Sequence, residues 1–345
     1  MIFSRKDEHI KIAKSQKSQY SSTAGFEDIE FIHCALPQLD LEKIDLKTEF
    51  LGKKINLPLM IGSMTGGTAL AKKINEKLAK VAEENLIPLA LGSYRPMLEN
   101  EKVSESYMVK KFCPSVPLIA NIGAIQLKEY KIEQIEWAIK KTEAEALAVH
   151  LNPLQESIQP EGQTNFEGVY EKIVEVAEKI DVPIIVKETG AGITQEVAKM
   201  FLSTKIRYID VSGRGGTSWS KVEYRRGGKI KGFEEWGYNT AVAIAECSKI
   251  MPTIGSGGIR DGIDVAKTIA LGAEIASASQ PFLVNNPATK IKIMREQLKR
   301  VMFLVGAKDI KELRKAPLVI TGKTAQLMQL RKIDLLMYAN RKIKE

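Results

Sequence analysis

The stretch MPTIGSGGIRDGIDVAKTIALGAEIASASQPF, residues 251–282, holds two short apolar runs separated by a segment with helical periodicity. The runs MPTIGSG (251–257) and EIASASQPF (274–282) are typical of buried strands, and GIDVAKTIALGA (262–273) has the apolar spacing of a helix. A strand, a helix and a second strand in this order predict two parallel strands joined by a crossover helix.

The same alternation continues toward the N-terminus and gives eight strand-like runs. The other six are PLMIGSM (58–64), IPLALGS (87–93), VPLIANIG (116–123), ALAVHLN (146–152), VPIIVKE (182–188) and RYIDVSG (207–213). Helical segments such as 68–85, 133–146 and 165–180 lie between most of them. Eight βα units with continuously apolar strands predict an α/β fold, a TIM (β/α)8 barrel. A doubly wound sheet is the alternative, but its GxGxxG loop is replaced by SMTGGT after the first strand.

We expect a single domain over residues 1–345. Residues 1–57 form an N-terminal extension, in which FIHCALPQLD and TEFLGKKINLP are expected to give a loop and a short hairpin over the barrel bottom. Residues 58–307 form the barrel, and residues 308–345 a helical, basic C-terminal tail docked outside it. The connection 213–237 is long for a compact domain, which is typical of a lid or binding loop on the catalytic face.

Composition narrows the classes of function. Hydrophobic residues make up 44% of the chain and charged residues 27%, as in a soluble globular protein. There is no apolar stretch of about 18 residues, no secretory signal and no CxxC pair among three cysteines, so we expect a cytoplasmic protein without a zinc site or disulfides. The net charge of +9 favours an anionic partner. A phosphorylated small molecule is favoured over nucleic acid because no nucleic-acid-binding motif is present.

Polar side chains gather at the predicted carboxyl ends of the strands, where the active sites of such barrels lie. They are Ser63, Met64, Thr65, Ser93, Arg95, Asn121, His150, Asn152, Gln155, Glu156, Lys187, Ser212, Thr217, Gly257, Gly258, Arg260, Ser279 and Gln280. Glycines after strand seven and a helix start after strand eight predict a phosphate site, with a tight turn as the alternative.

Two charged residues indicate the ligands. Lys187 would hold negative charge on a conjugated ring hydrogen-bonded by Ser63, Met64, Thr65, Asn121 and Thr217, a set that resembles the site of an FMN-binding barrel; a lysine snorkelling at a strand edge is the alternative. Glu156 is a lone acid, which suits Mg²⁺ completed by a diphosphate and water. Arg5, Lys6 and Arg95 are candidates to neutralise that diphosphate, although RKDEH (5–9) alone reads as a solvated charge run.

Taken in order, these motifs resemble the type 2, FMN-dependent isopentenyl diphosphate isomerases. The matching stretches are RKDEH (5–9), MTGGT (64–68), GSYR (92–95), NIGA (121–124), HLNPLQE (150–156), QPEGQTNF (159–166), VKETGAGI (186–193), DVSGRGGTSW (210–219), GSGGIRDG (255–262) and ASQPFL (278–283). GSGGIRDG is general to flavin barrels, whereas HLNPLQE with QPEG and the terminal RKxxH are specific to this family. Beyond residue 308 the match is weak, and Arg214 stands where Gly or Ala is usual, so an arginine there could reach the flavin phosphate or a neighbouring subunit.

The resemblance implies interconversion of isopentenyl and dimethylallyl diphosphate with FMN, Mg²⁺ and NADPH as the reductant. It implies FMN contacts from Ser63, Met64, Thr65, Ser93, Asn121, Lys187, Ser212, Thr217, Gly257, Gly258, Ile259, Arg260, Ser279 and Gln280. Substrate would be bound by Arg5, Lys6, His9, Ser93, Tyr94, Arg95, Gln155, Trp219 and Glu223, with His150 and Asn152 in the pocket and Mg²⁺ on Glu156. A homo-oligomer, tetramer or octamer, is expected.

The proton chemistry follows from the shortage of acids. Because Glu156 would hold the metal, we expect reduced flavin N5 to be the acid–base group, with Gln155 as a possible relay and Lys187, His150 and Asn152 beside it. Trp219 would stabilise developing positive charge, or simply pack the loop. An FMN-dependent oxidoreductase of the 2-hydroxy acid or dihydroorotate type is the alternative function, and a non-catalytic RNA-binding protein is the remote one.

Overall fold

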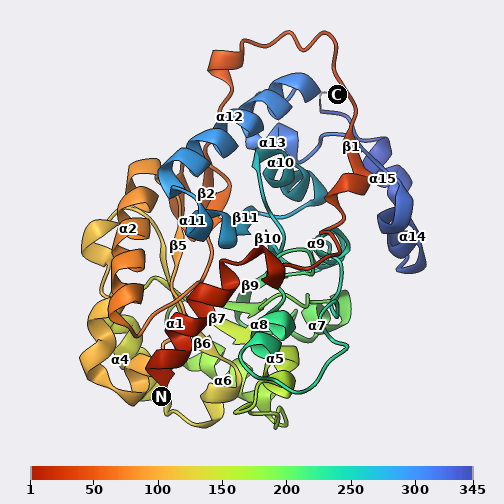
Figure 1. Cartoon of the computed structure of the whole chain (residues 1–345). Coiled ribbons are helices and arrows are strands. Elements are labelled where there is room, and N and C mark those ends of the chain that lie inside the picture. Colours follow the sequence, from red (N-terminus) through yellow and green to blue (C-terminus); the bar gives the residue numbers. More distant parts are fainter. Residues whose placement is uncertain (1, 344–345) are drawn as a thin grey trace.

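A closed barrel of eight parallel strands forms the centre of the molecule (Figure 1). This computed structural model describes the backbone of residues 2–343 and the side chains of residues 6–343. The strands are β4 (Leu59–Ile61), β5 (Leu89–Ala90), β6 (Leu118–Gly123), β7 (Ala146–Leu151), β8 (Ile184–Glu188), β9 (Ile206–Asp210), β10 (Thr253–Ser256) and β11 (Ile275–Ala278). Each pairs with the next in sequence, and β11 pairs with β4 to close the barrel. The predicted (β/α)8 barrel is confirmed.

Helices cover the outside of the barrel. The longer ones are α2 (Ala69–Asn85), α4 (Ile132–Thr142), α6 (Val169–Lys179), α9 (Thr240–Cys247), α10 (Gly262–Leu271) and α12 (Pro287–Val305). Shorter ones are α3 (Arg95–Glu99), α5 (Pro153–Ile158), α7 (Gln195–Met200), α8 (Trp219–Arg225) and α11 (Gln280–Val284). Local signals set their ends: the Asp261 side chain accepts from the first N–H groups of α10, and Gly272, at φ +119°, ends it.

The barrel interior is divided by the period of two along each strand. Inward-facing residues near the amino ends are apolar and form one buried cluster, which includes Ile119, Ala148, Ile185, Tyr208, Ile254 and Ile275. Two residues further along the same strands, and therefore on the same inward face, the side chains are polar: Asn121, His150, Lys187, Asp210, Ser256 and Ser277. Strand geometry thus gives the barrel an apolar floor and a polar mouth.

The N-terminal extension closes the barrel bottom, as expected. Its hairpin, β2 (Thr48–Phe50) and β3 (Lys53–Ile55), is antiparallel and places Phe50 and Ile55 in the inner cluster. The rings of Phe50 and Tyr208 lie 5.1 Å apart. The 3₁₀ turns η1 (Gln16–Ser18), η2 (Phe26–Asp28) and η3 (Leu41–Lys43) connect the rest of the extension.

The tail after the barrel is not purely helical, contrary to the prediction. It contains α13 (Ile310–Leu313), α14 (Gly322–Leu330) and α15 (Leu335–Ala339), but also the strand β12 (Leu318–Ile320). This strand pairs antiparallel with β1 (Ile29–Phe31) of the extension. Extension and tail are therefore joined by a two-stranded sheet outside the barrel (Figure 1). None of the helices that the structure describes is long and apolar enough to span a membrane.

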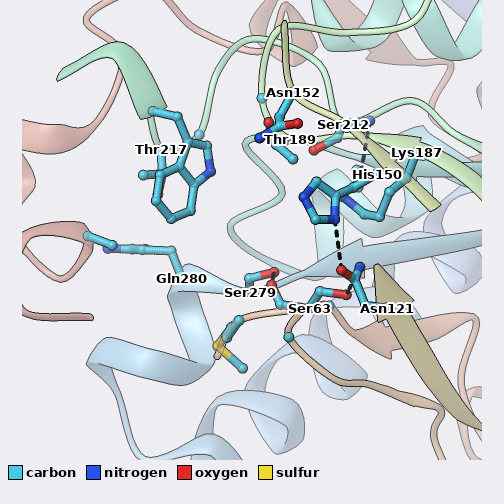
Figure 2. A pocket seen from close by; sticks show the side chains of 18 of the residues that line it. Ser63, Asn121, His150, Asn152, Lys187, Thr189, Ser212, Thr217, Ser279 and Gln280 are labelled. Atoms are coloured by element: carbon cyan, nitrogen blue, oxygen red, sulfur yellow. Dashed lines mark hydrogen bonds between the residues drawn. The ribbon is translucent and has the colours of Figure 1, made fainter. Parts of the chain in front are cut away.

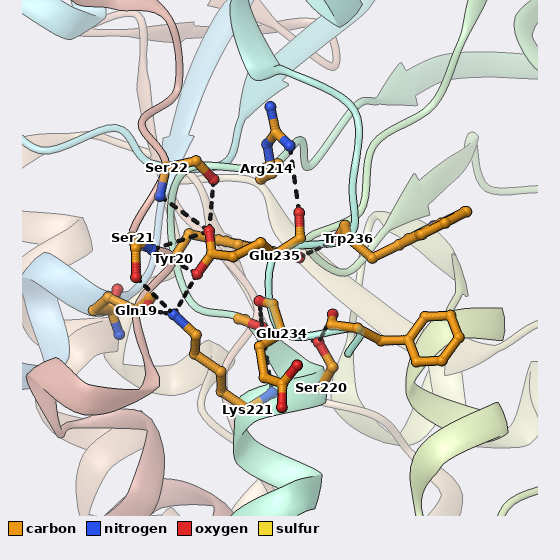
Figure 3. Close-up of polar contacts among 12 residues, drawn as sticks. Gln19, Tyr20, Ser21, Ser22, Arg214, Ser220, Lys221, Glu234, Glu235 and Trp236 are labelled. Atoms are coloured by element: carbon orange, nitrogen blue, oxygen red, sulfur yellow. Dashed lines mark hydrogen bonds and ion pairs between the residues drawn. The ribbon is translucent and has the colours of Figure 1, made fainter. Parts of the chain in front are cut away.

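The long connection after β9 is ordered by side chains that bind its backbone. Residues 219–225 form α8, and four successive carbonyls beyond it, those of residues 233–236, accept hydrogen bonds from Ser220, Ser218, Arg214 and Tyr20 respectively. The carboxylate of Glu235 accepts from the N–H groups of Ser21 and Ser22 and from Lys221 Nζ (Figure 3). The connection is thereby fastened to residues 18–22 of the extension, close to the barrel mouth.

Candidate active site

A single cavity at the mouth brings together nearly all the residues predicted for the site. The predicted residues that line it are Lys6, His9, Ser63, Met64, Thr65, Ser93, Arg95, Asn121, His150, Asn152, Gln155, Glu156, Lys187, Ser212, Thr217, Trp219, Gly257, Gly258, Ile259, Arg260, Ser279 and Gln280. They come from all eight strand ends and from α1 (Ile2–Ala13), which lies across the mouth of its own barrel (Figure 1). In this structure the N-terminal segment therefore covers its own site.

His150, Lys187 and Asp210 form a row across the floor of the cavity. Strand pairing places His150 beside Lys187, and Lys187 beside Asp210. Burial, with Lys187 and Lys6 nearby, lowers the pKa of His150 to about 3, so the imidazole is neutral at pH 7. Burial also raises the pKa of Asp210, whose carboxylate accepts a hydrogen bond from Ser256. Lys187, whose Nζ donates to the carbonyl of Glu188, thus lines the cavity between a neutral and an acidic neighbour.

A chain of hydrogen bonds sets the tautomer of His150 (Figure 2). Asn121 donates from Nδ2 to Ser63 Oγ over 3.2 Å, so its Oδ1 is left to accept from His150 Nδ1 at 2.9 Å. The proton of the neutral ring therefore sits on Nδ1, and Nε2 carries a lone pair. His150 can accept a hydrogen bond from a ligand but cannot serve as a strong acid at neutral pH.

The loop after β10 forms a backbone cradle for an anion. Gly257 and Gly258 have φ values of +102° and +76°, and a Cβ on Gly257 would lie 2.1 Å from the carbonyl oxygen of Gly213. Only glycine allows this close approach. Beside the cradle, Arg260 donates to Gln280 Oε1 over 2.7 Å and to Gln19 Oε1 over 2.6 Å, both neutral acceptors. A glycine turn of this shape next to a partly buried cation suits a phosphate.

Glu156 also lines the cavity, where amide groups surround its carboxylate. Its side chain is buried, and it accepts from Asn152 Nδ2 at 2.8 Å, from Gln159 Nε2 and from the Gln163 N–H at 2.8 Å. A carboxylate has about four lone-pair positions, so one remains for another partner. Within the described residues there is no cluster of three or more side chains able to bind a metal alone.

Helices α1 and α8 meet above this part of the cavity. His9 Nε2 lies 2.9 Å from Glu223 Oε1, and Gln155 Nε2 donates to the same oxygen over 2.7 Å. The rings of His9 and Trp219 are in T-shaped contact, with centroids 5.2 Å apart. Burial is the largest influence on the pKa of His9 and lowers it. Arg226 binds the second oxygen of Glu223.

Four predicted residues are placed differently. The Tyr94 side chain is buried beneath the mouth, where its hydroxyl donates to Thr142 on α4 over 2.7 Å, so the prediction of a substrate contact is wrong for this side chain. Glu223 has a fully buried side chain outside the cavity lining, where it contacts His9 and Gln155. Arg214 donates to the Glu235 carbonyl and does not line the cavity. The side chain of Arg5 lies outside the described residues.

Sequence reasoning also missed several lining residues. Asp210, Ser256 and Ser277 are inward-facing by the period of two, so their strands did carry a signal. Gln126 and Thr189 follow strands and Gln159 ends α5, and none of the three had a comparable signal.

Two buried polar atoms in the cavity lining lack partners, and they test whether ligands fit. Among the residues that the structure describes, neither Thr65 Oγ1 nor Asn152 Oδ1 has a hydrogen-bond partner. A buried polar atom without a partner costs free energy, which a bound ligand recovers. Thr65 lies among the residues predicted for the flavin, and Asn152 stands next to Glu156. The residues present therefore fit a flavin phosphate and ring, and a hard cation at Glu156.

This barrel and its mouth define the chain as an enzyme of the FMN-dependent dehydrogenase class, whose family model matches residues 9–114 and 129–320. The chain is 46% identical to an isopentenyl-diphosphate delta-isomerase of Pyrococcus abyssi, over 99% of this chain and 98% of that protein. It is 42% identical to one of Methanothermobacter thermautotrophicus, over 99% of this chain and all of that protein. The chain belongs to the isopentenyl-diphosphate delta-isomerase family.

A solved structure shows the same fold at lower identity. A lactate oxidase of Pediococcus acidilactici superposes with a TM-score of 0.66 at 18% identity, covering 92% of this chain and 93% of that one. At this identity the likeness concerns the fold alone.

Proposed function

We propose that the chain binds FMN across the barrel mouth and interconverts isopentenyl and dimethylallyl diphosphate, with Mg²⁺ on the diphosphate. One observation carries the proposal: the same cavity contains an anion cradle at residues 257–260 and, apart from it, the buried carboxylate of Glu156 among amides. The first suits a flavin phosphate and the second a metal-bound diphosphate. The full-length relatives named as isomerases support the same substrate.

The isomerisation moves one double bond and changes no oxidation state. A proton is added at the terminal alkene carbon, and another is lost from the carbon between the alkene and the carbon that bears the diphosphate. His150 is neutral and Glu156 is bound by amides, and the other acid in the lining, Asp210, accepts a hydrogen bond from Ser256 and lies beside Lys187. Reduced FMN, when bound, would supply an acid–base group at N5. NADPH is the proposed reductant.

The side chains would bind and orient the reactants. Lys187 would place its positive charge beside the electron-rich part of the ring, with Ser63, Thr65 and Asn121 as hydrogen-bonding partners. Gln155, held by Glu223, would relay or orient the moving proton. Glu156 would hold the cation, Lys6 and Arg95 would neutralise the diphosphate, and His9 and Ser93 would form hydrogen bonds with it. Trp219, the first residue of α8, would cover the alkene, and its ring face can stabilise positive charge there.

The remaining alternatives are weaker. An FMN-dependent oxidation of a 2-hydroxy acid has no use for the carboxylate of Glu156 and the amides around it. The solved structures named as oxidases of such acids are below 20% identical to this chain. A role in RNA binding rests on net charge alone. We further propose that the protein is cytoplasmic and assembles as a tetramer or octamer, as the family resemblance implies.

Reconstitution with a flavin analogue tests the proposal. The purified protein should be yellow and should regain isomerase activity with FMN under reducing conditions. With 5-deaza-FMN, which replaces N5 by carbon, the protein should bind the analogue but turn over no substrate. Full activity with 5-deaza-FMN would overturn the role of N5, and a colourless protein unable to bind FMN would overturn the flavin site.

A further inference from the structure

Gln19, a residue of the extension, joins three parts of the mouth although it does not line the cavity. Its side chain amide accepts from Arg260 Nη2 through Oε1 at 2.6 Å and donates through Nε2 to Thr217 Oγ1 at 3.1 Å. Nε2 also lies 3.4 Å from the carbonyl oxygen of Ala13, the last residue of α1. Only 5% of Gln19 is exposed, and Figure 3 shows it at the edge of the polar network on the extension.

The backbone around Gln19 holds the side chain in place. Gln19 and Thr217 form an antiparallel bridge, the N–H of Ser218 donates to the carbonyl of Ser18 over 2.8 Å, and the N–H of Tyr20 donates to the carbonyl of Gly216 over 2.9 Å. This short strand-like contact fixes the segment against the loop that follows β9. The amide of Gln19 therefore has little freedom to turn away from Arg260.

Arg260 is a partly buried cation whose guanidinium has only neutral hydrogen-bond partners among the described residues. Its guanidinium donates to the amide oxygens of Gln280 and Gln19, and among the described residues it forms no ion pair. The nearby carboxylate of Asp264 accepts from the backbone N–H of Arg260 instead. A partly buried charge without an ion pair loses part of its hydration, and an anion beside it offsets that cost.

We propose that Gln19 is a positioning residue for the phosphate end of the flavin: it fixes Arg260 and Thr217 without neutralising the arginine, and ties both to the end of α1. This inference rests on the proposed FMN binding. A neutral amide is required, because a carboxylate at the same place would pair with Arg260 and compete with the phosphate. The inference predicts that charge at residue 19, more than its size, controls affinity for the phosphate group.

The variant Gln19→Glu tests this with two ligands that differ only in the phosphate. Titration of the apoprotein by quenching of flavin fluorescence should show FMN affinity lowered at least tenfold, while riboflavin affinity stays within about twofold of wild type. The melting temperature of the apoprotein should be unchanged or raised, because the new carboxylate meets Arg260. Gln16→Glu, at an exposed position three residues earlier, is the control with the same change of charge and should leave both affinities unchanged.

The outcomes separate the inference from the function on which it rests. Equal loss of FMN and riboflavin affinity in Gln19→Glu would indicate a merely structural role and overturn the inference, as would FMN affinity equal to wild type. Gln19→Met, which removes the hydrogen bonds of the amide without adding charge, covers the case in which Gln19→Glu fails to fold: it too must weaken FMN more than riboflavin. Wild-type protein that binds neither flavin would overturn the proposed function instead.

Discussion

Gln155 and His9 share one oxygen atom of a fully buried carboxylate: Gln155 Nε2 donates to Glu223 Oε1 over 2.7 Å, and His9 Nε2 lies 2.9 Å from the same atom. Gln155 follows a barrel strand, whereas His9 belongs to α1 and Glu223 to α8. One carboxylate therefore orients a residue of the fixed barrel mouth and a residue of the covering helix. Arg226 holds the second oxygen, so the carboxylate itself cannot turn.

Glu223→Gln keeps the shape of this arrangement and removes its charge. Hydrogen bonds to charged groups contribute about 1.5–3 kcal/mol, so loss of the oriented pair should lower kcat roughly 10- to 100-fold. FMN affinity should stay within about twofold, because Glu223 does not contact the flavin cradle. Steady-state isomerase kinetics and flavin titration check the two effects separately. An unchanged kcat would show that the pair does not orient Gln155 for catalysis.

Glu156→Gln should separate metal dependence from flavin binding. The variant retains the surrounding amides but loses the only charged ligand at this position, so kcat/KM should fall at least 100-fold and respond to Mg²⁺ only at much higher concentration. Glu133→Gln, an exposed change of the same kind on α4, should behave as wild type. The measurement is initial rate against Mg²⁺ concentration, with chelator as the zero point. Wild-type activity that survives the chelator would contradict a metal at Glu156.

The buried His150 should make the folding stability of the apoprotein sensitive to acid. Its pKa is about 3 in the folded chain and near 6.5 when exposed, so the unfolded state binds the proton first as pH falls. Folding stability is then lost as pH drops from about 6.5 toward 3, at up to about 1.4 kcal/mol per pH unit from this group. Between pH 7 and pH 5 the wild type should lose about 2 kcal/mol more free energy of unfolding than His150→Gln. Urea unfolding at both values checks this, and parallel losses in the two proteins would refute it.

The β2–β3 hairpin at the barrel bottom should contribute to folding stability but not to FMN affinity. Phe50 is 1% exposed and packs against Tyr208 on the barrel floor, so Phe50→Ala should lower the free energy of unfolding by about 3–5 kcal/mol. Phe233→Ala, which removes a ring that is 37% exposed, should cost less than about 1 kcal/mol. FMN affinity of the folded Phe50→Ala protein should equal that of wild type. Similar unfolding free energies for the two variants would mean that the hairpin does not seal the barrel.

Local patterns in the sequence predicted the barrel well because each βα unit carries its own signals. Seven of the eight apolar runs contain one observed strand each, and the eighth overlaps β9, which begins one residue before it. Helices such as α2 and α10 lie where the apolar spacing placed them. The pairing of β1 with β12 could not be predicted in this way, since the two strands are nearly 290 residues apart and each has only three residues. The single-domain assignment of residues 1–345 remains a prediction.

Site residues could be predicted where the end of a strand points a side chain into the mouth. Contacts between residues far apart in the sequence could not be predicted. Asn121, His150 and Lys187 follow from strand position alone. Tyr94 lies in a matching motif, yet its side chain turns into the core, because motif membership does not give side-chain direction. Gln19 and Arg260 are hydrogen-bonded although they are 241 positions apart in the sequence, and no local sequence pattern predicts such a contact.

An anaerobic assay of the holoprotein tests the central claim most directly. Isopentenyl diphosphate is incubated with the protein, FMN, Mg²⁺ and NADPH, and product is followed by proton NMR while NADPH is followed by absorbance. The account predicts many turnovers to dimethylallyl diphosphate, with NADPH consumed only to reduce the bound flavin once. Absence of dimethylallyl diphosphate, or oxidation of one NADPH for every product molecule, would contradict it.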